Sequence, residues 1–136
     1  MDDRRLLGLG GALGALGVAM GAFGAHAVKG WLEAADDGAA RLAWWHTGAQ
    51  YHLAHALLIV ALGVWARSYP GRLPRAAAWC AAAGIVLFSG SLYAMALTGV
   101  RALGAVTPLG GVALLAAWAL VLLAAWRRDP PSNGQT

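Results

Sequence analysis

Residues 76–126 read AAAWCAAAGIVLFSGSLYAMALTGVRALGAVTPLGGVALLAAWALVLLAAW and contain a single charged residue, Arg101. A run of 25 uncharged residues stands on either side of that arginine. An α-helix rises about 1.5 Å per residue, so about 20 residues cross a hydrocarbon core of roughly 30 Å. A helix also satisfies its own backbone hydrogen bonds, as lipid requires. The stretch therefore predicts two membrane-spanning helices.

Two more uncharged windows, Leu6–Val28 and Leu42–Ala66, precede this stretch and hold 23 and 25 residues. The four predicted helices cover about residues 6–28, 44–66, 76–100 and 107–126. In the last of them, Thr107 is expected as the N-cap and Pro108 as the first helical residue. The sequence thus predicts one all-α domain over residues 1–128, an integral membrane four-helix bundle, with a disordered tail over 129–136.

The composition of the chain supports a membrane protein. Hydrophobic residues make up 60% of the 136 residues and charged residues 12%, against about 25% in an ordinary soluble domain. The net charge is +4, but the ten Lys and Arg lie singly or in pairs between the windows, so no basic face for nucleic acid forms. All six acidic residues also lie outside the windows. The lone Cys80 excludes an internal disulfide.

The distribution of basic residues predicts the orientation of the helices. Seven Lys and Arg belong to the N-terminus, the second loop and the C-terminus, whereas three belong to the first and third loops. The positive-inside rule then places both termini in the cytoplasm. One rival interpretation remains: Arg4-Arg5, the apolar run and Ala25-His26-Ala27 resemble a signal peptide, although this run exceeds the usual length of about 7–15 residues.

The first window carries a stripe of glycines with spacings of four and three residues: Gly10, Gly14, Gly17, Gly21 and Gly24. Residues at these spacings share one face of a helix, where the absence of side chains lets another helix approach closely. We expect this stripe to pack within the bundle. Contact between copies of the chain in a homo-oligomer is the alternative.

Polar side chains gather toward the outer half of the predicted bundle. The candidate cluster consists of His26, Tyr51, His52, His55, Ser89, Ser91, Tyr93 and Thr107. The favoured interpretation is a hydrogen-bonded network that holds the helices together, in which hydroxyls of Ser89, Ser91 or Tyr93 pair with His55. The alternatives are a binding site for haem, quinone, lipid or metal, and a proton or substrate pathway. The sequence does not identify a cofactor or a metal.

Four blocks of the sequence resemble a known family, the family of unknown function numbered 423. They are GAFGAHA at 21–27, TGAQYHLAHAL at 47–57, FSGSLY at 88–93 with TG at 98–99, and TPLGG at 107–111 followed by Trp118. His52 departs from the pattern, because many members carry Gln there. The resemblance covers about residues 6–126 and implies a four-span protein of the bacterial inner membrane, without implying an activity.

No nucleophile, base and acid stand in a recognisable catalytic arrangement, so the sequence predicts a protein that is not an enzyme. We expect a small structural or accessory membrane protein. Its expected partners are membrane lipids, a second copy of the chain, or the other subunits of a larger membrane complex, and not nucleic acid. The alternative is a binding protein whose ligand occupies the polar cluster.

Overall fold

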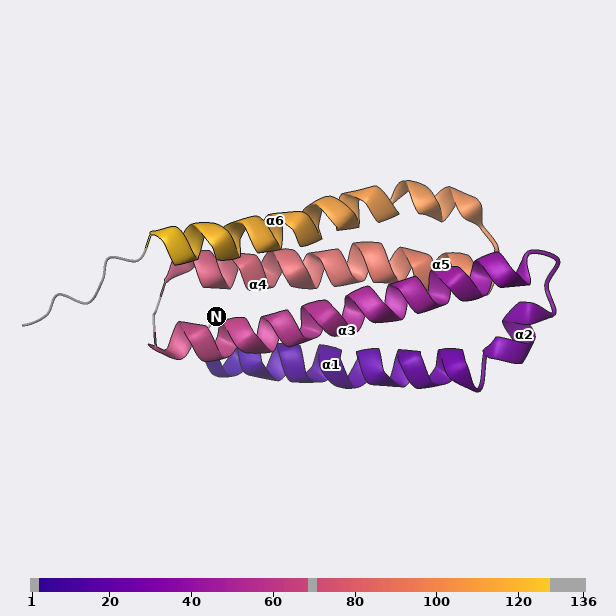
Figure 1. Cartoon of the computed structure of the whole chain (residues 1–136), viewed down its shortest axis with the longest axis horizontal. Helices are drawn as coiled ribbons and strands as arrows, with labels where there is room; N and C mark the ends of the chain where they lie inside the picture. The colour runs from indigo at the N-terminus through magenta and orange to yellow at the C-terminus, as the bar shows by residue number, and fades with distance from the viewer. Residues whose placement is uncertain (1–2, 69–70, 128–136) are drawn as a thin grey trace, which may run out of the picture.

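The computed structural model describes residues 3–68 and 71–127, and the predicted tail lies outside these ranges. The described residues form helices without strands (Figure 1). In chain order these are α1 (Asp3–Ala25), α2 (Lys29–Glu33), α3 (Gly38–Ser68), α4 (Arg72–Gly84), the π-helical turn η1 (Ile85–Ser89), α5 (Gly90–Thr98), the 3-10 helix η2 (Arg101–Ala105) and α6 (Thr107–Trp126).

Four helical segments within the described residues are long and apolar enough to cross a membrane, which confirms the expected four-helix membrane bundle. They are Arg4–Ala25, Gly38–Ser68, Arg72–Thr98 and Arg101–Trp126. The third of these runs through α4, η1 and α5 without a break. The second span, α3, begins at Gly38, earlier than the expected residue 44, because its helical hydrogen bonding extends through Arg41 beyond the uncharged window.

The spans lie side by side in the order α1, α3, the α4–η1–α5 segment, and α6 (Figure 1). Helix α1 packs mainly against α3, whereas α6 packs against α4 and η1 on the opposite edge of the bundle. The first and last described residues lie at the same end of the bundle, and α2 lies at the other end (Figure 1). This arrangement agrees with two termini on one side of the membrane, and their cytoplasmic location stays a prediction.

The contact between α1 and α3 follows a seam along α1 that alternates small and large residues: Leu6, Gly10, Leu13, Gly17, Met20 and Gly24. A Cβ atom added to Gly10 would lie 2.8 Å from the backbone nitrogen of Val60. At Gly24, the same atom would lie 2.4 Å from the indole of Trp45. The two helices therefore approach so closely at these positions that only glycine fits.

The other two glycines of the predicted stripe do not take part in this seam. No atom lies within 4 Å of a Cβ added to Gly14 or Gly21, so the expectation that all five glycines pack together is wrong for these two. On a helix with 100° per residue, Gly14 and Gly21 are rotated toward one edge of the stripe. Helix α3 lies along the opposite edge, which contains Gly10, Gly17 and Gly24.

Aromatic side chains at the end of the seam nearest α2 tie three helices together. Trp45 of α3 is buried. Its Nε1 donates a hydrogen bond to the Met20 carbonyl of α1 at 2.8 Å, and its ring centroid lies 4.9 Å from that of Tyr93 in α5. Trp45 therefore joins α1, α3 and α5 from inside the bundle.

Helix α6 approaches η1 just as closely. A Cβ atom added to Gly110 would lie 2.2 Å from the backbone nitrogen of Phe88, so the two backbones touch at this point. Thr107 is the first residue of α6 rather than its N-cap, which is Val106 without a side-chain capping bond. The predicted capping role of Thr107 is thus wrong, because its hydroxyl pairs with Ser91 across the helix interface.

Candidate functional site

His55 lies in the middle of α3, and both of its ring nitrogens have partners. Nδ1 donates to the Tyr51 carbonyl one turn earlier at 2.8 Å, and Nε2 accepts from Trp118 Nε1 of α6 at 3.2 Å. An indole N–H can only donate, so Nε2 carries the lone pair and the imidazole is neutral. The expected partners Ser89, Ser91 and Tyr93 are wrong, because His55 turns toward α6.

His52 lies on the same helix but faces a different neighbour. Its Nδ1 lies 3.4 Å from the Tyr93 hydroxyl, and its ring edge packs against Gly17 of α1. The side chain is 2% exposed, and Nε2 has no hydrogen-bond partner among the described residues. The two histidines therefore contact opposite sides of the bundle and do not form one site.

Two hydroxyls of the polar cluster, those of Ser91 and Thr107, pair with each other apart from both histidines, where α5 meets the start of α6. Ser91 Oγ donates to the Phe88 carbonyl at 2.9 Å and lies 2.8 Å from Thr107 Oγ1. Ser89, the last residue of the π-helical turn, is fully buried, and its hydroxyl has no partner among the described residues. The bond between Ser91 and Thr107 ties α5 to the start of α6.

His26 does not belong to the polar cluster, which corrects the expectation from the sequence. Helix α1 ends at Ala25, so His26 lies in the turn that leads to α2, where it is exposed. His46 is exposed as well. Nowhere in the described parts of the chain do three His, Cys, Asp or Glu side chains come close enough to hold a metal ion.

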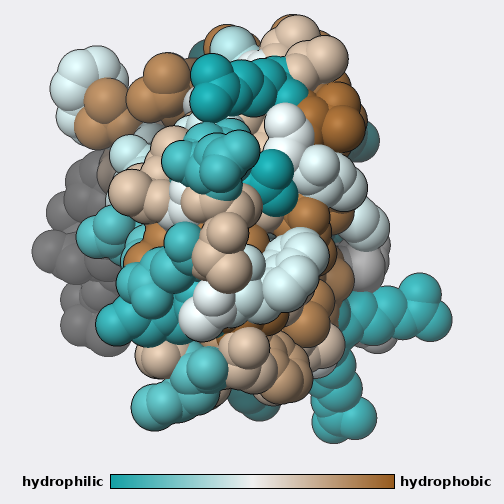
Figure 2. All heavy atoms as spheres, turned by 90° about the vertical axis from the view of Figure 1, so that its right-hand side faces the viewer, coloured by the Kyte–Doolittle hydropathy of each residue, from teal (hydrophilic) through white to brown (hydrophobic). Residues whose placement is uncertain are grey.

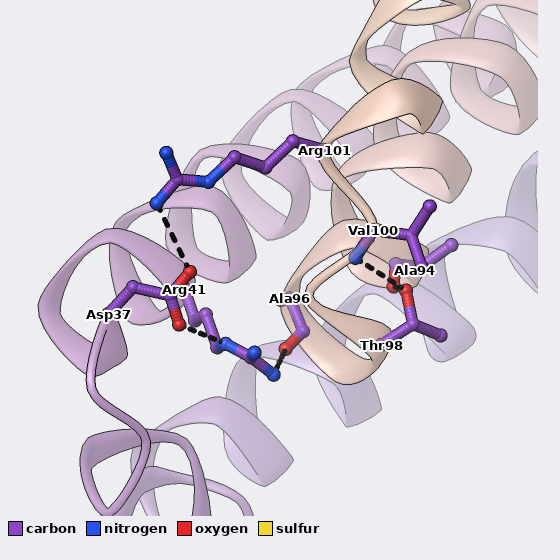
Figure 3. Close-up of polar contacts among 7 residues, drawn as sticks. All are labelled: Asp37, Arg41, Ala94, Ala96, Thr98, Val100 and Arg101. Carbon is purple, nitrogen blue, oxygen red and sulfur yellow. Dashed lines mark hydrogen bonds and ion pairs between the residues drawn. The ribbon is translucent and has the colours of Figure 1, made fainter.

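The end of the bundle that carries α2 holds an ionic cluster that the sequence analysis missed. It consists of Asp37, Arg41 and Arg101 (Figure 3). Arg41 Nε lies 2.5 Å from Asp37 Oδ1, and Arg101 Nη2 lies 3.4 Å from Asp37 Oδ2. The hydrogen bond from Arg41 lowers the pKa of Asp37 below its usual 3.8, and Arg101 adds to the effect. The spacing of four residues between Asp37 and Arg41 is a sequence signal that could have indicated this pair.

Arg41 also closes the end of α5. Its Nη1 donates to the Ala96 carbonyl at 3.5 Å (Figure 3), and its guanidinium lies where a side chain of Gly99 would stand. Gly99 ends α5 with a φ of 74°, a left-handed conformation that favours glycine. Figure 2 looks at this end of the bundle and shows hydrophilic side chains gathered across it among hydrophobic ones. The cluster joins the start of α3 to the loop between α5 and α6.

A lateral groove opens between α3, η1 and α6 with a volume of about 490 Å³. Among the candidate residues, Tyr51 and His55 line it, together with Trp118, which the sequence analysis placed in a motif but not in the site. A smaller cavity of about 230 Å³ lies between α1 and the α4–η1–α5 segment, with His52 and Tyr93 in its wall. Four of the eight candidate residues are thus divided between two cavities on different sides of α3, and the other four line neither cavity.

Comparisons with known proteins agree with the fold and the motifs. Residues 20–111 match the family described as "Protein of unknown function (DUF423)". The chain is 45% identical over 117 residues to the UPF0382 membrane protein YwdK of Bacillus subtilis, an alignment that covers 85% of this chain and 91% of YwdK. It is 40% identical over 130 residues to the UPF0382 inner membrane protein YgdD of Escherichia coli K12, covering 93% of each.

No solved structure resembles the chain closely enough to count as a match. The extent of the family match and the identities confirm the resemblance seen in the four sequence blocks. The chain belongs to the DUF423 family, and it is a small multi-pass protein of the inner membrane whose activity is unknown.

Proposed function

We propose that this protein is a non-enzymatic accessory component of a larger membrane assembly, and that α1 docks against a transmembrane helix of a partner protein. The supporting observation is the face of α1 that points away from α3. Its exposed small residues are Gly8, Gly11, Ala12, Ala15 and Ala22, and the exposed side chain of Val18 stands at its edge. We call this surface the free α1 face.

The free α1 face has the composition of a helix-packing surface. Inside lipid, helices associate through close van der Waals packing, for which small residues at spacings of three and four are suited. Gly8 and Gly11 have no atom within 4 Å of an added Cβ, so packing within the chain does not require glycine at either position. A helix-interior glycine costs roughly 0.5–1 kcal/mol relative to alanine. A partner helix that approaches closely would offset this cost.

The low burial of α1 also favours the free α1 face as the surface that a partner helix would cover. Only 17% of the residues in the most apolar window of α1 are buried, against 50% in α3. Helix α1 also exposes the large side chains Leu16, Val18 and Phe23, but small residues occupy the face opposite α3. Helix α6 is also peripheral, and it presents large side chains such as Leu115 and Trp118 outward. Large flexible side chains suit contact with lipid, whereas the Gly and Ala surface of α1 suits contact with another backbone.

Site-specific photo-cross-linking in native membranes tests this proposal. A photo-reactive residue at Ala15, on the free α1 face, should give a discrete protein adduct, whereas the same residue at the exposed Leu122 of α6 should react with lipid. Gly11→Leu should abolish the adduct, because open space around Gly11 lets the larger side chain fit without disturbing the fold.

Three results would contradict the proposal. Reaction of position 15 with lipid alone would show that no helix docks there. Survival of the adduct in Gly11→Leu would place the contact elsewhere. An adduct between two copies of this chain would replace the accessory role with self-assembly.

A further inference from the structure

The lateral groove between α3, η1 and α6 opens sideways toward the hydrocarbon of the membrane. Its lining includes Tyr51, His55, Phe88, Gly111 and Trp118. Val112, Leu115 and Trp118 stand at its exposed rim on α6. Its volume of about 490 Å³ lies within the range of roughly 300–1,000 Å³ that is typical of small-molecule sites. A molecule dissolved in the bilayer can therefore enter without crossing water.

The inner walls of the groove consist of aromatic rings from three segments. The Tyr51 ring lies nearly parallel to that of His55, at 10° with centroids 6.0 Å apart, and 4.7 Å from the ring of Phe88. Trp118 meets His55 edge-on, with centroids 6.3 Å apart. Flat rings of this kind favour a flat, conjugated ligand, because offset stacking and edge contacts both require planar partners.

Tyr51 supplies the only hydroxyl group in the groove lining, its side chain is 44% exposed, and no hydrogen bond joins this hydroxyl to another described residue. Tyr51 lies 13 residues after Gly38, where α3 begins, which corresponds to about 20 Å of helix. It is therefore far from both ends of the span. An unpaired hydroxyl in hydrocarbon is costly, so a ligand that accepts a hydrogen bond would stabilise it.

The other polar groups of the groove are already paired. His55 Nε2 accepts from Trp118 Nε1, and His55 Nδ1 donates to a backbone carbonyl, so neither histidine nitrogen is available to a ligand without breaking a bond. The free donor at Tyr51 thus defines what the ligand must carry, namely an acceptor at the edge of a planar ring.

We propose that this groove binds the carbonyl-bearing ring of a membrane-soluble quinone, with the Tyr51 hydroxyl donating to a ring carbonyl. The ring stacks against Tyr51 and Phe88, and its isoprenoid tail leaves past Val112 and Leu115 into the bilayer. A lipid acyl chain is the competing occupant, but it has no acceptor for Tyr51 and does not need planar walls. The site lies on the opposite edge of the bundle from the free α1 face, so the two proposals are independent.

Calorimetric titration of the purified full chain in detergent with ubiquinone-1 tests the proposal. The wild type should bind one ubiquinone-1 per chain, saturably. Tyr51→Phe should weaken the Kd roughly five- to tenfold, the effect of one lost hydrogen bond. Tyr93→Phe is the matched control: it removes the hydroxyl beside His52, outside the groove, and should leave the Kd unchanged.

A second pair of variants tests the location of the site without touching a hydrogen bond. Gly111 lines the groove, and a Cβ there would meet Phe88 at an ordinary 3.8 Å, so Gly111→Leu should fold and abolish binding. Gly90 lines the smaller cavity beside His52 and has open space around it, so Gly90→Leu should bind ubiquinone-1 as the wild type does.

Absence of saturable binding by the wild type, or an unchanged Kd in Tyr51→Phe, would overturn the proposal. It would also be overturned if Gly90→Leu lost binding while Gly111→Leu still bound ubiquinone-1. Displacement of ubiquinone-1 by equimolar didecanoyl phosphatidylcholine would also overturn it, because the groove would then hold acyl chains. Retention of ubiquinone-1 against this lipid supports a ring-selective site.

Discussion

Replacing Gly110 by alanine should separate α6 from the π-helical turn. The added Cβ would lie 2.2 Å from the Phe88 nitrogen and 2.7 Å from its Cα, whereas ordinary contacts begin at 3.4 Å. The obstructing atoms are backbone, so they cannot rotate away, and the helices must move apart by about 1 Å to reach a normal contact distance. Overpacking of this kind costs about 1–3 kcal/mol, and the higher helix propensity of alanine returns roughly 0.5–1 kcal/mol. We expect a net destabilisation of about 1–2 kcal/mol.

The neighbouring Gly111 provides the matched control. An added Cβ there would meet Phe88 Cδ2 at 3.8 Å, an ordinary contact, so Gly111→Ala should leave stability unchanged or raise it slightly. Reversible unfolding of both variants in mixed detergent micelles, followed by circular dichroism, measures the difference in the free energy of unfolding. Equal stability of Gly110→Ala and Gly111→Ala would refute the close approach of α6 to η1.

Three further predictions concern the polar contacts. In a double-mutant cycle, His55→Leu and Trp118→Phe should be non-additive by about 0.6 kcal/mol in unfolding free energy, the average for a hydrogen bond between membrane helices, and strict additivity would mean that the bond does not form. Arg41 lowers the pKa of Asp37 in the folded state below its value near 3.8 in the unfolded chain. The ionised Asp37 therefore contributes to folding stability above the unfolded pKa, and this contribution is lost as pH falls through the folded pKa. The melting temperature should therefore drop more steeply below about pH 4 in the wild type than in Asp37→Asn, and parallel curves would argue against the ion pair. Gly99→Ala should destabilise the chain by about 1–2 kcal/mol, since its left-handed conformation disfavours a side chain, and an unchanged melting temperature would contradict the turn geometry.

The membrane spans could be predicted from sequence because charge is so costly in hydrocarbon. A window without charged residues and longer than about 20 residues leaves few alternatives to a spanning helix. The ends of the helices were less predictable, because charged residues continue a helix once it reaches the headgroup layer. Arg41 and Arg67 both lie within α3 for this reason.

The glycine stripe shows what helical periodicity leaves open. Spacings of four and three place Gly10, Gly14 and Gly17 on one face, but they do not say along which edge of that face the partner helix lies. Helix α3 lies along the edge of Gly10 and Gly17, and Gly14 faces open space. The opposite face, with Gly8 and Ala15, is also rich in small residues. The sequence pattern alone did not show which of the two faces packs against α3.

The hydrogen-bond partners within the site could not be predicted, because they depend on how the helices are rotated about their axes. Ser89, Ser91 and Tyr93 are the polar residues of the neighbouring span, yet His55 pairs with Trp118 of α6. The π-helical turn adds a residue to the third span and changes the direction of the side chains that follow it. No residue pattern in the third window indicated this turn.

Paired cysteine cross-linking in the Cys80→Ser background tests most directly whether α1 and α6 lie on opposite edges of the bundle, on which the free α1 face depends. Leu7 of α1 packs against Gly63 of α3, where an added Cβ would lie 3.1 Å from Leu7 Cγ, whereas Leu123 of α6 lies across the bundle from Leu7. Oxidation in native membranes should join Leu7→Cys to Gly63→Cys within one chain and should not join Leu7→Cys to Leu123→Cys. An intramolecular bond of comparable yield between positions 7 and 123 would show a closed bundle, which contradicts this arrangement of the helices.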